Sequence, residues 1–189
     1  MTARLPHLLL ALTLVASLAR AQQPAGVSQT LNSLADQPAS HISFSFDRSM
    51  LQYATTFIDN GNAQAKHAAA ALNSISVDSY HYREPAFYIP EAMGSIISTY
   101  HAAGWKHLVD ANANPAMSAQ PNKPITDLWL HFKGTEIDDV TVLVRGQREM
   151  NLIQISCLLR PLDLIHLSGH FGIPKVDPNA VMVPAPDGR

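Results

Sequence analysis

The residues best suited to chemistry lie near the C-terminus, at Asp163, His166 and His170. Their spacing places a carboxylate and two imidazoles within about 60° of one another on a single helix. Imidazole and carboxylate groups are ligands that zinc accepts in proteins. Leu167 occupies the position of the Glu in a His-Glu-x-x-His motif, so no general base accompanies these ligands. The pattern leaves two interpretations open. One is the site of a metal-binding protein or metal-dependent enzyme, and the other is a polar stripe that faces solvent.

The other titratable residues form no known catalytic motif. His81, His107 and His131 each lie in a predicted strand, and whether they meet depends on the strand order. Asp138 and Asp139 are adjacent in a predicted strand, so we expect them to project to opposite faces and to form no carboxylate dyad. A Gly-x-Ser-x-Gly elbow, a glycine-rich phosphate loop and a Cys-x-x-Cys pair are all absent from the sequence. We therefore expect no catalytic residues and no cofactor, and a non-enzymatic role is favoured.

A second candidate site comes from the strands predicted between residues 125 and 159. Leu128, Val142 and Ile153 share one apolar face of these strands. A sheet that is covered by helices on one side is normally polar on the other. Here the opposite face is largely apolar too, and we take it as a candidate partner-binding patch made of Trp129, His131, Leu143, Met150 and Leu152. Such a patch would bind a protein partner or a second copy of the chain, unless the tail, a loop or a further helix covers it.

The single cysteine excludes an intramolecular disulfide. Cys157 lies on the same side of its predicted strand as Ile153, Ile155 and Leu159. We therefore expect a buried thiol and a fold that is stabilised by its apolar core.

Residues 1–21 have the composition of a cleavable signal peptide. Arg4 precedes an apolar run of about eleven residues, and Ala19 and Ala21 stand at the −3 and −1 positions of a cleavage site. The run is shorter than the roughly 20 residues of a membrane-spanning helix. No Cys follows the site, so we expect no lipid anchor and no stable membrane anchor after cleavage. The prediction is a periplasmic or secreted protein of a bacterial envelope.

The charge balance argues against a nucleic-acid partner. Cleavage after Ala21 removes two of the 13 basic side chains and none of the 15 acidic ones, which leaves 11 against 15, or a net charge of −4. The charged residues are spread along the chain, so no basic stripe is present to neutralise a phosphate backbone.

The mature chain divides by composition into three parts. Residues 22–40 are rich in Gln, Ser, Ala and Pro and predict a flexible lead-in, with one short helix around Leu31–Leu34. Residues 41–173 predict a single domain of normal core size. Residues 174–189 contain repeated prolines and no apolar periodicity, so they predict a disordered tail.

The first half of the domain begins with a strand and a helix. His41–Phe46 alternates strictly and predicts a half-buried strand whose inner face is formed by Ile42, Phe44 and Phe46. Asp47 is a suitable N-cap for the helix that follows. Its apolar residues recur at helical spacing and are Met50, Leu51, Ala54, Phe57 and Ile58.

A longer helix is predicted to begin at Pro90. Its apolar stripe has the spacing i, i+3, i+4, i+7 and consists of Met93, Ile96, Ile97 and Tyr100. Gly104 is placed to cap it in the left-handed conformation. Three period-2 segments between residues 128 and 159, joined by short Gly-containing turns, then predict an antiparallel meander, and Pro161 begins a final short helix.

Together these elements predict an α+β fold. We expect a two-layer domain with an antiparallel sheet of five or six strands, including the C-terminal meander, and with helices mainly on one face.

The pattern in the C-terminal half resembles a known bacterial family, domain of unknown function 4252. The likeness is carried by Val140–Arg145, Leu152–Cys157 and Leu162–Leu167, together with the Gly104-Trp105 step, and covers residues 40–173. The resemblance implies an exported or lipid-anchored envelope protein without an assigned activity, and it implies no catalytic residues. The missing lipid-anchor Cys departs from that family.

Overall fold

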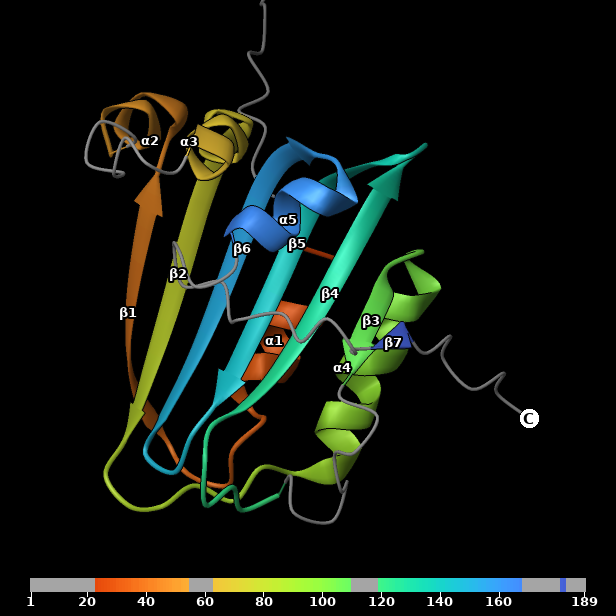
Figure 1. The fold of residues 1–189 in the computed structure, drawn as a ribbon. Coiled ribbons are helices and arrows are strands. Elements are labelled where there is room, and N and C mark those ends of the chain that lie inside the picture. Colours follow the sequence, from red (N-terminus) through yellow and green to blue (C-terminus); the bar gives the residue numbers. More distant parts are fainter. Residues whose placement is uncertain (1–22, 55–62, 110–118, 168–180, 183–189) are drawn as a thin grey trace, which may run out of the picture.

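The computed structural model describes residues 23–54, 63–109, 119–167 and 181–182, so the predicted leader lies outside the described residues. Within these ranges, seven strands form one antiparallel sheet in the order β1-β2-β6-β5-β4-β3-β7 (Figure 1). Their bounds are Ala39–Phe46 (β1), Leu72–Tyr82 (β2), Lys106–Val109 (β3), Ile125–Lys133 (β4), Glu136–Arg145 (β5), Glu149–Leu159 (β6) and Val181–Met182 (β7). The α+β class, the antiparallel sheet and the meander β4–β5–β6 are confirmed.

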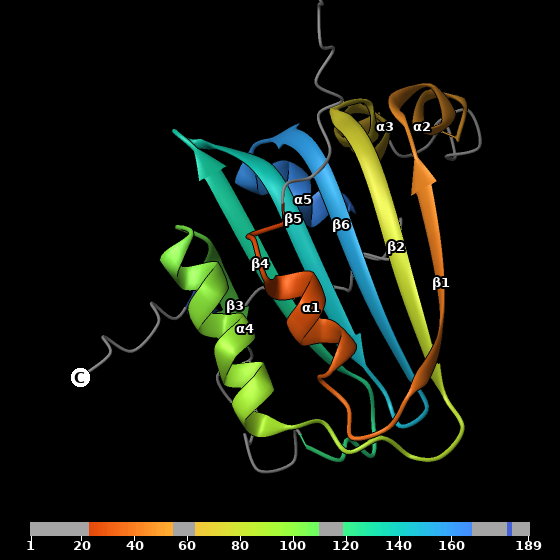
Figure 2. The same cartoon turned by 180° about the vertical axis from the view of Figure 1, so that it is seen from behind.

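The described helices lie on both faces of the sheet. They are α1 (Val27–Asn32), α2 (Arg48–Ala54), α3 (Ala63–Ala70), α4 (Pro90–Ala102) and α5 (Pro161–Leu167). Helices α1 and α4 cover one face, whereas α2, α3 and α5 lie on the other (Figures 1 and 2). The expectation of two layers with helices mainly on one face is therefore wrong in this detail. The physical reason is that the meander strands are apolar on both faces, and each face needs its own cover.

Helix α1 corrects the prediction of a flexible lead-in. Residues 27–32 are helical, and Val27, Leu31 and Leu34 are buried in the same core as α4. Backbone hydrogen bonds from Asp36 to Phe87 and from Ile89 to Leu34 hold the chain that follows α1 in place. Val27, Leu31 and Leu34 all pack on the sheet face that α4 also covers. The free energy gained by burying them offsets the entropy cost of ordering the segment.

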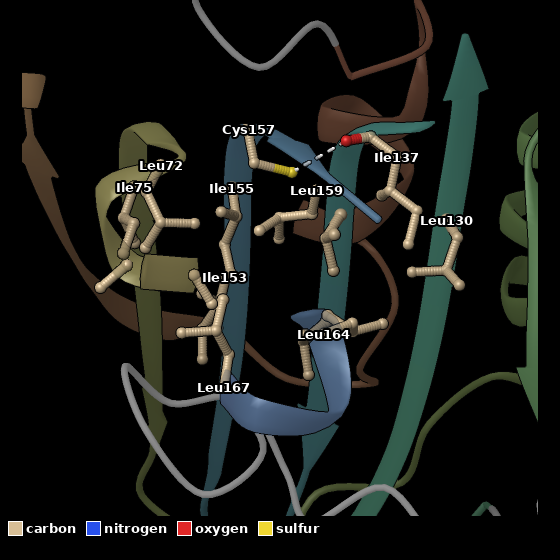
Figure 3. Packing of buried hydrophobic residues seen from close by; sticks show 14 of the residues in the cluster. Leu72, Ile75, Leu130, Ile137, Ile153, Ile155, Cys157, Leu159, Leu164 and Leu167 are labelled. Atoms are coloured by element: carbon tan, nitrogen blue, oxygen red, sulfur yellow. Dashed lines mark hydrogen bonds between the residues drawn. The ribbon is translucent and has the colours of Figure 1, made fainter. Parts of the chain in front are cut away.

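The core between the sheet and α2, α3 and α5 is aliphatic (Figure 3). Its side chains come from four strands and three helices and include Leu72, Ile75, Leu130, Ile137, Ile153, Ile155, Cys157, Leu159, Leu164 and Leu167. The Cys157 thiol donates to the carbonyl of Ile137 over 3.4 Å. Burial, followed by the nearby carboxylates of Asp139 and Asp138, raises the pKa of Cys157 to about 12. The predicted burial of the thiol is thus confirmed.

The core between the sheet and α1 and α4 is aromatic. The predicted stripe of α4 places Met93, Ile96 and Tyr100 in it, and Gly104 adopts φ 83° after the helix, as its position predicts. The ring of Tyr100 stacks on Trp129 with centroids 4.7 Å apart and meets Trp105 edge-on at 5.1 Å. These stacked and T-shaped contacts join α4 to β4 and to the residue that precedes β3.

Two predictions about the ends of the domain have different outcomes. The final helix is confirmed from Pro161 but ends at Leu167 among the described residues. Val181–Met182, which fall within the predicted disordered tail, form the short strand β7 beside β3. The rest of that tail lies outside the described residues.

Candidate interaction surface

Strand β1 forms one edge of the sheet. Its eight residues pair with β2 in an unbroken antiparallel register from Ala39–Tyr82 to Phe46–Ile75. Among the described residues no other strand pairs with β1, so its outer side presents a row of backbone N–H and C=O groups. Natural edge strands are usually protected by Lys, Pro or a bulge. Strand β1 contains none of these, and its only titratable residue is His41.

The apolar face of β1 is exposed. Ile42, Phe44 and Phe46 were predicted to form the buried face of a half-buried strand, but 43–57% of each residue's surface is accessible. In the register they lie opposite Ser79, Val77 and Ile75, so they share the face of the sheet on which α2, α3 and α5 pack. Those helices cover β2 and the meander and leave β1 open. The predicted strand is confirmed, and the predicted burial of its apolar face is wrong.

Helix α2 extends the exposed apolar surface beyond the end of β1. The backbone N–H of Met50 donates to Asp47 Oδ1 over 2.9 Å, which confirms the predicted N-cap and lowers the pKa of Asp47. Leu51 is buried, whereas Met50 and Tyr53 are 57% and 71% exposed. Met50 therefore does not belong to the inner stripe predicted for it. We call these five exposed residues of β1 and α2, namely Ile42, Phe44, Phe46, Met50 and Tyr53, the edge patch.

The opposite face of β1 is polar and holds the strand to its neighbour. His41 Nε2 lies 2.9 Å from Asp78 Oδ1, and the imidazole ring stacks on Tyr80 with centroids 4.5 Å apart. These side-chain contacts join β1 to β2 on the face that α1 and α4 cover. They therefore hold in place the strand that carries most of the edge patch.

The partner-binding patch predicted from the sequence is buried. Trp129, Leu143, Met150 and Leu152 belong to the aromatic core, and Trp129 is only 1% exposed. His131 is partly exposed, at the end of β4. The prediction of an exposed contact surface here is wrong, because α1 and α4 cover the face. The sequence also allowed that a further helix covers this face, and the structure supports that alternative.

The predicted metal set on the last helix is not assembled among the described residues. The Asp163 carboxylate accepts two hydrogen bonds from the Arg160 guanidinium, at 2.9 and 3.0 Å, and one from the Arg160 backbone N–H at 3.1 Å. These hydrogen bonds lower the pKa of Asp163. His166 lies exposed on α5, and His170 lies outside the described residues. The Asp163 carboxylate, which the metal interpretation requires as a ligand, is therefore already bound by Arg160.

A buried ionic network, which the sequence did not reveal, crosses three strands on the α1/α4 face. The Arg145 guanidinium donates to Asp127 Oδ2 at 2.9 and 3.3 Å, and His107 Nε2 lies 3.2 Å from Asp127 Oδ1. Burial alone raises the pKa of Asp127, but the hydrogen bond to His107 and the charge of Arg145 outweigh it, so the pKa lies below its ordinary value. The His107 ring also stacks on Trp129, with centroids 4.7 Å apart. The network is nearly closed to solvent, which makes it a structural element of the core.

Comparison with known proteins adds no relative. No family model matches the chain, and neither a curated protein nor a solved structure matches it. The resemblance to domain of unknown function 4252 therefore stays a prediction. Within the described residues, no helix has both the length and the apolar character that a membrane crossing requires.

Proposed function

We propose that this chain is a non-catalytic interaction module that associates with a second copy of itself through strand β1. The observation that carries the proposal is an unprotected eight-residue edge strand with three exposed apolar side chains on one face. Unpaired strand edges of this kind accept a further strand, with the backbone supplying hydrogen bonds and the side chains supplying selectivity. The interaction function expected from the sequence is kept, and its surface moves from the Trp129 face to the edge patch.

The sequence of β1 is complementary to itself in an antiparallel arrangement. A two-fold axis at Phe44 would place Phe44 beside its own copy and Ile42 beside the partner's Phe46, all on one face. Ser43 and Ser45 would then pair on the other face. No formal charge opposes its own copy in this register, and the partner's Asp47 would approach His41. A two-fold pairing thus satisfies both the backbone edge and the apolar side chains.

The size of the edge patch is adequate for a specific dimer. Large apolar side chains have surfaces of about 200 Å², and roughly half of each of the five residues is exposed. The five residues therefore expose about 500 Å² on each copy, so pairing can bury at most about 1,000 Å² of side-chain surface in total, before the backbone is counted. That area reaches the lower range of specific protein interfaces.

The decisive experiment is sedimentation of the purified chain with and without one charge in the edge patch. We expect the wild-type chain to be dimeric at micromolar concentration. Phe44→Lys should be monomeric, because the two-fold axis brings the two ammonium groups together. Leu162→Lys is the matched control, since Leu162 is also exposed and apolar but lies on α5. It should remain dimeric.

Two outcomes would overturn the proposal. One is a wild-type chain that sediments as a monomer at about 100 µM, a concentration at which an interface of this size should form. The other is a Phe44→Lys variant that stays dimeric. Circular dichroism of both variants excludes unfolding as the cause of any change.

We also propose that the protein works outside the cytoplasm, on the evidence of the signal-peptide pattern in residues 1–21. Expression of the full chain in a bacterial host should yield a periplasmic or secreted product whose mass corresponds to a chain beginning at Gln22. A cytosolic product that retains Met1 would contradict this proposal and would leave the dimer proposal untouched.

A further inference from the structure

A β-bulge in β5 changes the direction of two adjacent carboxylates. In the pairing with β4, His131 is opposite Asp139 and Phe132 is opposite Ile137, so Asp138 has no partner. The pairing with β6 also passes from Ile137 to Asp139. Ile137 and Val140 both lie in the aliphatic core, although they are three residues apart. The extra residue places Asp138 and Asp139 on the same side as His131, which corrects the expectation that they project to opposite faces.

The three side chains converge at the β4–β5 end of the sheet. His131 Nδ1 lies 2.7 Å from Asp138 Oδ1, and one possible ligand atom from each of His131, Asp138 and Asp139 lies within 4.8 Å of the other two. Ligand atoms around a metal ion with bonds of about 2.1 Å are separated by about 3 to 4 Å. Small side-chain rotations therefore bring the cluster to coordinating distances. All three residues are partly exposed, so an ion can enter.

One oxygen of the cluster lacks a protein partner. Asp139 Oδ1 is buried and accepts no hydrogen bond, whereas the same carboxylate receives a hydrogen bond from Ser156. Buried oxygens of native proteins are nearly always satisfied, and an ion is one of the partners that satisfy them. The second carboxylate, Asp138, adds a like charge beside the first. Burial and that charge raise the pKa of Asp139 to about 6.

We infer that His131, Asp138 and Asp139 form a binding site for a divalent transition-metal cation of the Zn²⁺ class. One imidazole nitrogen and two carboxylate oxygens are a mixed donor set that suits zinc better than Ca²⁺ or Mg²⁺, which take oxygen ligands. A divalent cation offsets both carboxylate charges and gives Asp139 Oδ1 a partner. Three protein ligands leave the remaining coordination positions to water. The site is separate from the edge patch and does not depend on the proposed dimer.

The surroundings of the cluster restrict how His131 can move. Its ring packs against Trp105 at 5.3 Å between centroids, with the planes tilted by 46°. Trp105 is buried and contacts Tyr100, so it holds one side of the imidazole. A ligand whose orientation is fixed by packing loses little conformational freedom when it binds a metal. The same proximity makes Trp105 fluorescence a reporter of a quenching ion at the site.

The test is titration of the purified, tag-free chain with metal salts. We expect one Zn²⁺ per chain by isothermal calorimetry, and absorption bands of inner-sphere coordination with Co²⁺. Bound Co²⁺ should also quench tryptophan fluorescence. His131→Gln and Asp139→Asn should each lower the Zn²⁺ affinity at least about 100-fold, because removing a direct ligand costs more than removing an outer partner.

His41→Gln is the matched control. His41 and Asp78 form a similar imidazole–carboxylate pair at 2.9 Å, and no third ligand is found beside them among the described residues. This variant should bind Zn²⁺ as the wild type does. The inference is overturned if the wild-type chain binds no stoichiometric Zn²⁺ and shows no Co²⁺ bands. It is also overturned if His131→Gln and Asp139→Asn, with unchanged circular dichroism, bind like the wild type.

Discussion

Trp129 on β4 and Phe44 on β1 both lie in alternating strands, yet they have opposite environments. Trp129 is 1% exposed beneath α1 and α4, whereas Phe44 is 53% exposed at the sheet edge. Phe44 belongs to an apolar stripe of period two, whereas Trp129 shares its side of β4 with Asp127 and His131. The difference lies in the cover that other segments provide. Period two therefore identifies which side chains share a face, and it does not say whether anything packs on that face.

The apolar side chains of central and peripheral strands are also covered to different extents. The meander strands are central, and helices from both ends of the described chain cover them. Strand β1 is peripheral, and its apolar stripe continues outward from Val77 and Ile75 past the limit of the covering helices. A second copy of the chain would place its own apolar stripe beside that of β1, as the neighbouring strands do for β4. Three variants test this difference between core and edge, and a fourth tests the carboxylate cluster at the β4–β5 end of the sheet.

The largest effect is expected from Trp129→Ala. It removes a buried ring that stacks on Tyr100 and on His107. The free energy of unfolding should fall by about 4 kcal/mol, in the range of large aromatic deletions from cores. Urea unfolding followed by circular dichroism measures the loss. A loss below about 1 kcal/mol would mean that α1 and α4 do not cover this face in solution.

Asp127→Ala should have the next largest effect. It leaves the buried Arg145 without the carboxylate that it contacts, and breaking one half of a buried pair costs about 3 kcal/mol. The folded-state pKa of Asp127 is lowered, so the wild-type chain holds this stability above about pH 4 and loses it as the pH falls through the folded pKa. Unfolding curves between pH 7 and pH 3 should converge for the two proteins. Curves that remain parallel would contradict the role of the network.

Asp139→Asn should raise the stability of the metal-free chain. The pKa of Asp139 is raised to about 6, so at pH 7.5 the folded state carries the charge at a cost that the unfolded state does not have. A shift of this size corresponds to about 3 kcal/mol for a fully buried group. Partial exposure reduces the expected gain to about 1 kcal/mol. Thermal unfolding at pH 7.5 and pH 4.5 measures it, and the gain should be smaller at pH 4.5, because the folded carboxyl is protonated there and incurs no charge cost.

Phe44→Ser should have the smallest effect on the folded monomer. The residue is on the surface of a single copy, so its free energy of unfolding should change by less than about 0.5 kcal/mol in dilute, monomeric solution. The dimer, in contrast, should weaken. Urea unfolding at two protein concentrations separates these quantities, because only the dimer depends on concentration. A loss in the monomer similar to that of Trp129→Ala would place Phe44 in the core.

Local signals predicted most elements of the fold correctly. The stripe after Pro90, the left-handed Gly104, the Asp47 cap and the three alternating strands each depend on neighbouring residues. The bulge at Asp138 also left a local trace, since Ile137 and Val140 break the period-two pattern by one residue. That irregularity was the signal that could have located the metal cluster. The network around Asp127 left none, because its three members are brought together only by strand pairing.

The sequence by itself determined the α+β class, the antiparallel meander, the buried thiol of Cys157 and the absence of a disulfide. These properties follow from short-range periodicity, turn residues and composition. The tertiary structure decided that Trp129 is buried in the core and that Phe44 is exposed. It also decided that Arg160 binds the Asp163 carboxylate and that Asp138 and Asp139 lie on the same side of β5. Each of these depends on which segments meet. A side chain's chemistry is set by its neighbours in space, and those neighbours come from distant parts of the chain.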